Sequence, residues 1–167
     1  MDIQASLKET DQTFTEFLLI LASVREDQIN TIPFKGSWTA GQLAQHIVLS
    51  AGGFVQLING PFNDTNRDPE LHSANITATF LNFNIKMQSP DFINPPVKEY
   101  HQQELIHTLQ DIKADLLKAI QKTDPTLTCT AFEVPVLGYL TRAEAITFTI
   151  VHTQRHINQL KNINKNL

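Results

Sequence analysis

The sequence predicts an all-α fold, a bundle of four long helices. Four stretches carry apolar residues at helical spacings of three and four, and no two stretches show the alternation of paired strands. Turn-forming residues separate the four stretches. The chain of 167 residues is long enough to bury a substantial core, and we expect one domain over residues 1–167.

The first two helices are expected before residue 60. Apolar residues line one side of residues 7–24, which predicts a helix that ends near Arg25. The second helix begins at Thr39, where Gln42 completes a capping box that satisfies unpaired amides of the first turn. Its apolar stripe runs over residues 43–58, and Asn59 and the following Gly-Pro pair stop it.

The long connection over residues 61–98 is expected to be mostly irregular. Its first part is rich in turn-forming residues, and the segment ATFLNFNIKM fits either a short helix or an extended segment. Long connections in compact domains often form lids or the edge of a binding site, and a surface excursion of no function is the alternative.

The last two helices follow this connection. Leu105, Leu109, Ile112, Leu116 and Ile120 predict the third, which closes at residues 123–125. The segment TLTCTAFEVPVLGYL favours β structure, yet its proline, Pro135, and its glycine, Gly138, indicate an extended crossover. The fourth helix begins with a second capping box, Thr141 and Glu144, and continues to about Asn164.

Composition excludes several classes of function. Thirteen basic and seventeen acidic residues give a net charge of −4 without a basic cluster, which argues against nucleic acid as the main partner. The start of the chain lacks the pattern of a signal peptide, and the longest apolar run, residues 17–24, is too short to span a bilayer. We therefore expect a cytoplasmic protein that does not contact a membrane.

Cys129 is the only cysteine, so the chain can form neither an intrachain disulfide nor a cysteine-rich zinc site. A metal site would have to use histidine, carboxylate or water. His152 and His156 stand one helical turn apart on the face that also carries core residues, so both rings could point at one cation. Two histidines in a packed core are the alternative reading.

His46 favours the metal reading, because it lies close to the inward side of the second helix. Three neutral imidazoles from two helices could bind a divalent ion and leave positions for water or substrate. Burying them without a metal would leave ring nitrogens in need of partners.

The other polar residues of interest have simpler readings. We expect the remaining histidines to face solvent or to cap helices: His72, His101 and His107. Trp38 reads as a packing anchor or a lid over the end of the bundle. Arg155 and Gln159 flank the histidine pair and could either orient a substrate anion or line a solvated helix edge.

Two segments, SWTAGQLAQHI and LTRAEAITFTIVHTQRHINQL, together resemble the DinB superfamily, which includes YfiT-like metal-dependent hydrolases. The family pattern is a tryptophan at the entrance to the second helix, a histidine within it, and HxxxH on the last helix; here these are Trp38, His46, His152 and His156. The resemblance implies an up-down-down-up four-helix bundle, often a homodimer, with zinc, nickel or manganese on the three histidines.

Similar proteins include bacillithiol-dependent thiol transferases and mycothiol-dependent isomerases. We therefore predict a metal-dependent enzyme that activates water or a low-molecular-weight thiol as a hydrolase or thiol S-transferase. The alternatives are a non-catalytic dimeric bundle that binds a metal or small molecule, and a metal-free scaffold with a polar cluster. No general base is identifiable, because Glu144 is better explained by its capping box.

Overall fold

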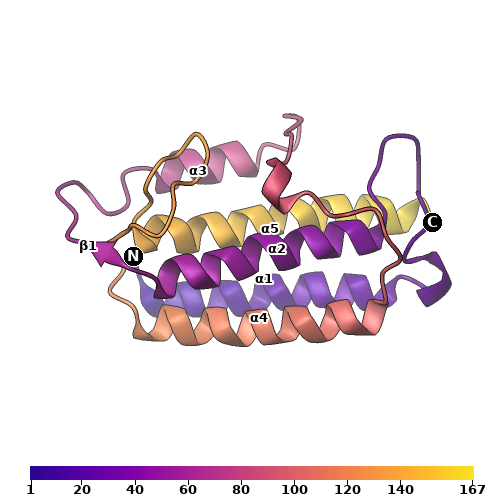
Figure 1. Cartoon of the computed structure of the whole chain (residues 1–167), viewed down its shortest axis with the longest axis horizontal. Helices are drawn as coiled ribbons and strands as arrows, with labels where there is room; N and C mark the ends of the chain where they lie inside the picture. Colours follow the sequence, from indigo (N-terminus) through magenta and orange to yellow (C-terminus); the bar gives the residue numbers. More distant parts are fainter.

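The computed structural model describes residues 1–167 and confirms the predicted four-helix bundle (Figure 1). The long helices are α1 (Ile3–Ser23), α2 (Ala40–Asn59), α4 (Gln102–Lys122) and α5 (Arg142–Lys165). None of the helices is both long and apolar enough to cross a membrane.

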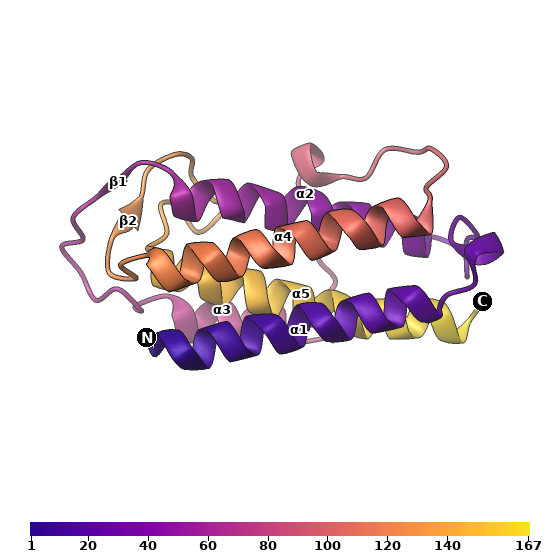
Figure 2. The same ribbon diagram turned by 90° about the horizontal axis from the view of Figure 1, so that it is seen from below.

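The bundle has the expected up-down-down-up order. Followed along the chain in Figures 1 and 2, α1 and α5 run in one direction while α2 and α4 run in the other. Both α4 and α5 pack against α1 and against α2, so α1 and α2 lie on one diagonal of the bundle. This arrangement brings α2 and α5, which carry the three histidines of interest, into direct contact.

The four apolar stripes meet in one core of 31 buried residues. Phe14, Phe17 and Leu21 of α1 are completely buried, as the spacing of the first stripe predicts. Gly41 permits a close approach at the start of α2, because an added Cβ there would lie 2.8 Å from the Cβ of Tyr100.

Both predicted capping boxes are present. Thr39 accepts a hydrogen bond from the amide of Gln42, and the Gln42 side chain accepts one from the amide of Thr39. Thr141 and Glu144 repeat the arrangement at the start of α5. Each box satisfies amides that the first helical turn leaves unpaired, and so defines the first residue of a histidine-bearing helix.

The connection between α2 and α4 contains more regular structure than expected. A short helix, α3 (Ser73–Phe80), begins five residues before the segment considered as a possible helix, and it packs along α5. The turn η2 (Asp91–Ile93) lies against α2 (Figure 1). A further turn, η1 (Glu26–Gln28), follows α1.

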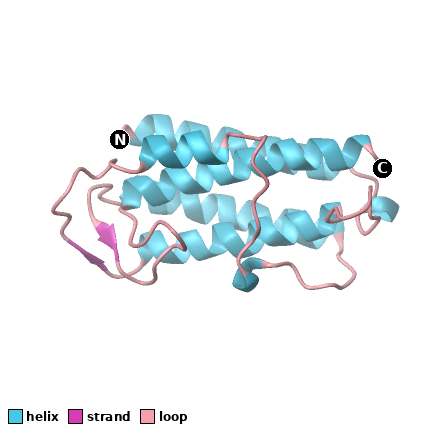
Figure 3. Ribbon diagram, turned by 90° about the horizontal axis from the view of Figure 1, so that it is seen from above, coloured by secondary structure: helices cyan, strands magenta, loops and turns pink.

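A two-stranded sheet closes one end of the bundle, the end at which the N-terminus also lies (Figure 3). Strand β1 (Phe62–Asn63) pairs antiparallel with β2 (Thr128–Cys129), with Phe62 opposite Cys129. The rest of the segment before α5 contains only isolated bridges, in agreement with the predicted extended crossover.

A buried ion pair ties the connection to α5 at the same end. The Glu144 carboxylate is fully buried and accepts two hydrogen bonds from the Arg67 guanidinium, at 2.7 and 2.6 Å. It also accepts hydrogen bonds from the amides of His72 and Thr141. Burial raises the pKa of this carboxyl, but these hydrogen bonds and the Arg67 charge outweigh burial and lower the pKa below its usual value.

Candidate metal site

The structure brings together the three histidines singled out in the sequence. His46 lies on α2, two helical turns after Thr39, and His152 and His156 lie one turn apart on α5. Their side chains meet where α2 packs on α5, with exposed fractions of 2%, 7% and 8%. Helical register alone therefore places all three rings in the interior.

The rings converge through the same atom. The Nε2 atom of His152 lies 3.2 Å from that of His46 and 3.1 Å from that of His156. Ligand nitrogens on a tetrahedral zinc ion with Zn–N bonds of 2.0–2.1 Å are separated by about 3.3–3.4 Å. The ligand nitrogens of the three imidazoles all lie within 4.8 Å of one another, so they could hold a metal ion; that they bind one stays a prediction.

Each ring is also held at its other nitrogen. Nδ1 of His46 lies 2.9 Å from the carbonyl oxygen of Ile93, and Nδ1 of His156 lies 2.9 Å from the Gln159 amide oxygen. Nδ1 of His152 lies 3.2 Å from the Ser50 hydroxyl. Contacts of this kind orient histidine ligands in metal sites.

Burial keeps the histidines neutral. Desolvation lowers the pKa of His46, although its bond to Ile93 offsets part of the effect. It lowers the pKa of His152 well below its usual value, with repulsion from the two other histidines and Arg155 in the same direction. Burial and the charge of His46 lower the pKa of His156 to about 3. Near neutral pH, protons therefore do not compete with a cation for these nitrogens.

Aromatic side chains form the walls of the site. The Trp38 ring lies 5.0 Å from that of His46 and packs on the core, which fits the predicted packing anchor. Phe148 stacks on His152 at 5.4 Å, and Phe80 approaches the same ring edge-on. These apolar rings account for the strong desolvation of the imidazoles.

The second half of the long connection lies beside the site, as a lid would. Ile93 contacts His46, and the Ser89 hydroxyl lies 3.5 Å from the same ring nitrogen. Arg155 holds the start of this segment by donating hydrogen bonds to three main-chain carbonyls: Phe80, Asn82 and Ile85. The Arg155 guanidinium therefore binds main-chain carbonyls, whereas the sequence suggested either a substrate anion or a solvated helix edge.

The other candidate residues lie outside the cluster. His72 and His101 occupy the N-cap positions of α3 and α4, but their side chains make no capping hydrogen bond. The side chain of His107 is 78% exposed. Glu144 serves the capping box and the ion pair with Arg67, so the structure identifies no general base there.

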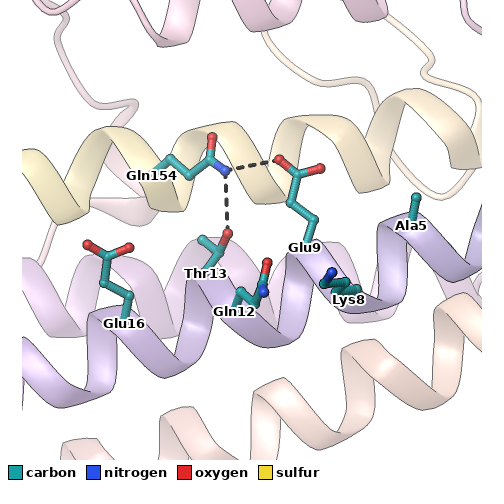
Figure 4. A pocket seen from close by; sticks show the side chains of 7 residues that line it. All are labelled: Ala5, Lys8, Glu9, Gln12, Thr13, Glu16 and Gln154. Carbon is teal, nitrogen blue, oxygen red and sulfur yellow. Dashed lines mark hydrogen bonds between the residues drawn. The ribbon is translucent and has the colours of Figure 1, made fainter.

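A surface groove between α1 and α5 does not belong to this site (Figure 4). Its lining is almost entirely polar, and Gln154 spans it with hydrogen bonds to Glu9 and Thr13. Gln154 is two residues from each histidine of α5, and a two-residue step turns a helical side chain by about 200°. The groove therefore lies on the other side of α5 from the imidazoles.

Known proteins share this architecture. The sequence profile of the DinB superfamily matches residues 9–160. TT2238, described as a four-helix bundle protein, has a TM-score of 0.62 and 16% identity over 96% of this chain and 99% of that one. YfiT from Bacillus subtilis, described as a probable metal-dependent hydrolase with an unusual four-helix bundle topology, has a TM-score of 0.60 and 12% identity, over 98% of this chain and 86% of that one. The comparison with curated proteins found no match.

Proposed function

Because the chain belongs to the DinB superfamily, we propose that it is a metal-dependent enzyme whose divalent ion is held by His46, His152 and His156. The proposed substrate is a small molecule, and the proposed nucleophile is water or a low-molecular-weight thiol. The reaction would be a hydrolysis or a thiol transfer. Zinc, nickel and manganese are the candidate ions, since imidazole accommodates several divalent metals.

The convergence of the three Nε2 atoms carries this proposal. The carbonyl of Ile93 and the amide oxygen of Gln159 can only accept, so His46 and His156, when neutral, carry their protons on Nδ1. Their Nε2 lone pairs therefore both face Nε2 of His152, in a buried space lined by aromatic rings. A cation satisfies such a group of acceptors better than one shared proton does.

Three protein ligands are the number typical of catalytic zinc sites. A bound divalent metal would supply Lewis-acid activation of a water or thiol, lowering its pKa toward neutrality. The chain's own residues would hold the ion, keep its ligands unprotonated and limit the access of bulk water. None of the three imidazoles is hydrogen-bonded to a carboxylate, so the set of three ligands and their hydrogen-bond partners carries no net charge.

The test is elemental analysis of untagged protein purified without chelator, before and after incubation with zinc, nickel or manganese. We expect near-stoichiometric metal in the wild type and its loss in a His46→Ala, His152→Ala double variant. A His101→Ala, His107→Ala variant removes two exposed histidines and serves as the matched control. Metal-free wild type after all three incubations would refute the proposal, and metal binding would lead to assays of thiol transfer and hydrolysis.

The near-complete burial of the histidines favours a second candidate, a homodimeric bundle that binds metal without turnover. A closed site fits storage or structure better than catalysis, which requires an accessible ligand position. Cobalt-loaded protein distinguishes the two candidates through its visible absorption. A spectrum that shifts when a small thiol is added supports the enzyme, and one that no added thiol or small anion changes supports the binding protein.

A further inference from the structure

The three groups that hold the Nδ1 atoms differ in their chemistry. The Ile93 carbonyl belongs to the main chain and can only accept a hydrogen bond. The Gln159 amide oxygen is also an acceptor, but it belongs to a side chain that can be replaced. The Ser50 hydroxyl can donate or accept. These differences decide which tautomers each histidine can adopt.

Gln159 places His156 in the tautomer that a metal requires. By accepting from Nδ1–H, its amide oxygen leaves the Nε2 lone pair of His156 directed into the cluster. Ile93 does the same for His46. Two of the three ligands are therefore prepared for a cation before one arrives.

His152 has a different requirement, because its Nε2 lies between the two others at 3.2 and 3.1 Å. In the metal-free site, a proton on Nε2 of His152 prevents the lone pairs of the three Nε2 atoms from facing one another. Nδ1 of His152 then accepts a hydrogen bond from the Ser50 hydroxyl. In a loaded site Nε2 must be free, so His152 carries its proton on Nδ1 and donates a hydrogen bond to the Ser50 hydroxyl oxygen. Only a group that both donates and accepts serves both states.

We infer that Ser50 and Gln159 are positioning residues of the metal site, Gln159 by fixing the tautomer of His156 and Ser50 by allowing that of His152 to change. This inference rests on the proposed function. Both residues follow a histidine on its own helix, Ser50 four residues after His46 and Gln159 three residues after His156, so the helices that carry the ligands also carry their supports.

For Gln159 the experiment compares the cobalt affinity of three variants with the wild type, by competition with a chromophoric chelator, and records the visible spectrum of each complex. Gln159→Leu should weaken binding about 10- to 100-fold, the usual effect of losing such a support. Gln159→Glu keeps an acceptor oxygen whichever way it turns, and should bind at least as tightly as the wild type. The matched control is Gln154→Leu, on the other side of α5, which should leave affinity and spectrum unchanged.

For Ser50 the same measurements apply to Ser50→Ala, with Ser50→Thr as the variant that restores a hydroxyl. The control is Thr153→Val, which removes a buried hydroxyl that donates to the Thr149 carbonyl beside the site. Ser50→Ala should weaken binding about 10- to 100-fold and Ser50→Thr should recover part of the loss. Thr153→Val should lower the melting temperature without changing the cobalt affinity.

The outcomes separate this inference from the proposal beneath it. Wild-type protein that binds no cobalt refutes both. Wild-type protein that binds cobalt, with Ser50→Ala and Gln159→Leu folded and unchanged in affinity and spectrum, refutes the inference alone. Gln159 is only partly buried, so its variants test the inference even if Ser50→Ala fails to fold.

Discussion

Lowering the pH should destabilise the metal-free protein because its buried histidines are neutral. In the unfolded chain a histidine takes up a proton near pH 6.5, whereas the pKa of His156 in the folded protein is lowered to about 3. The unfolded state therefore binds the proton first, and stability is lost as the pH falls from 6.5 toward 3. Above pH 6.5 the ionisation of this histidine should contribute almost nothing to the pH dependence of stability.

The magnitude follows from the difference between the two pKa values. Below pH 6.5, each unit of pH should lower the free energy of unfolding by about 1.4 kcal/mol for His156 alone. Between pH 7 and pH 5 the loss is about 2 kcal/mol, a large share of the roughly 5–15 kcal/mol typical of a domain. His46 and His152 act in the same direction, because their pKa values are also lowered.

Urea denaturation at a series of pH values in the presence of a chelator measures this effect. In a His156→Gln variant the loss between pH 7 and pH 5 should be smaller than in the wild type by about 2 kcal/mol. The control is His101→Gln, at an exposed position before α4, which should keep the wild-type dependence. Equal pH dependence in the wild type and the His156→Gln variant would contradict the argument.

Three further predictions concern the scaffold. Arg67→Ala leaves the fully buried Glu144 carboxylate without its cation and should lower the free energy of unfolding by about 3–5 kcal/mol, measured by urea denaturation; a loss below 1 kcal/mol would contradict this. Burial raises the pKa of Cys129 to about 11, so the thiol should resist iodoacetamide at pH 8 in the folded protein and react in urea; rapid labelling of folded protein would show that it is accessible. Gly41→Ala should lower the melting temperature because its Cβ would clash with a tyrosine, while Gly53→Ala, with nothing within 4 Å, should stabilise α2 by about 0.5–1 kcal/mol; equal effects of the two would show that the close approach is unimportant.

The sequence predicted those parts of the fold that depend on local rules. The starts of α2 and α5 follow from capping boxes whose partners are three residues apart, so they could be read without knowledge of the fold. The start of α3 could not be read from the sequence, because no side chain caps this helix. Ile76 is its only fully buried residue, so the helix has no apolar stripe in its sequence and depends on packing against α5.

The same distinction applies to the site. The inward orientation of the His46, His152 and His156 side chains follows from helical spacing, which is why the sequence could predict that they meet. Gln159 was missed as a support, although its spacing of three residues from His156 was visible. Ser50 could not be found in this way, because it contacts His152 on the other helix. The contact with Ile93 depends on the path of the long connection, and no pattern in the sequence indicates that path.

The capping boxes of α2 and α5 also act as angular reference points for the site. His46 stands seven residues after Thr39, and His152 stands eleven after Thr141, close to two and three whole turns. One residue inserted between a cap and its histidine would turn the ring by about 100° and direct it away from the others. Along these two stretches the protein can therefore tolerate changes of side chain far more readily than changes of length.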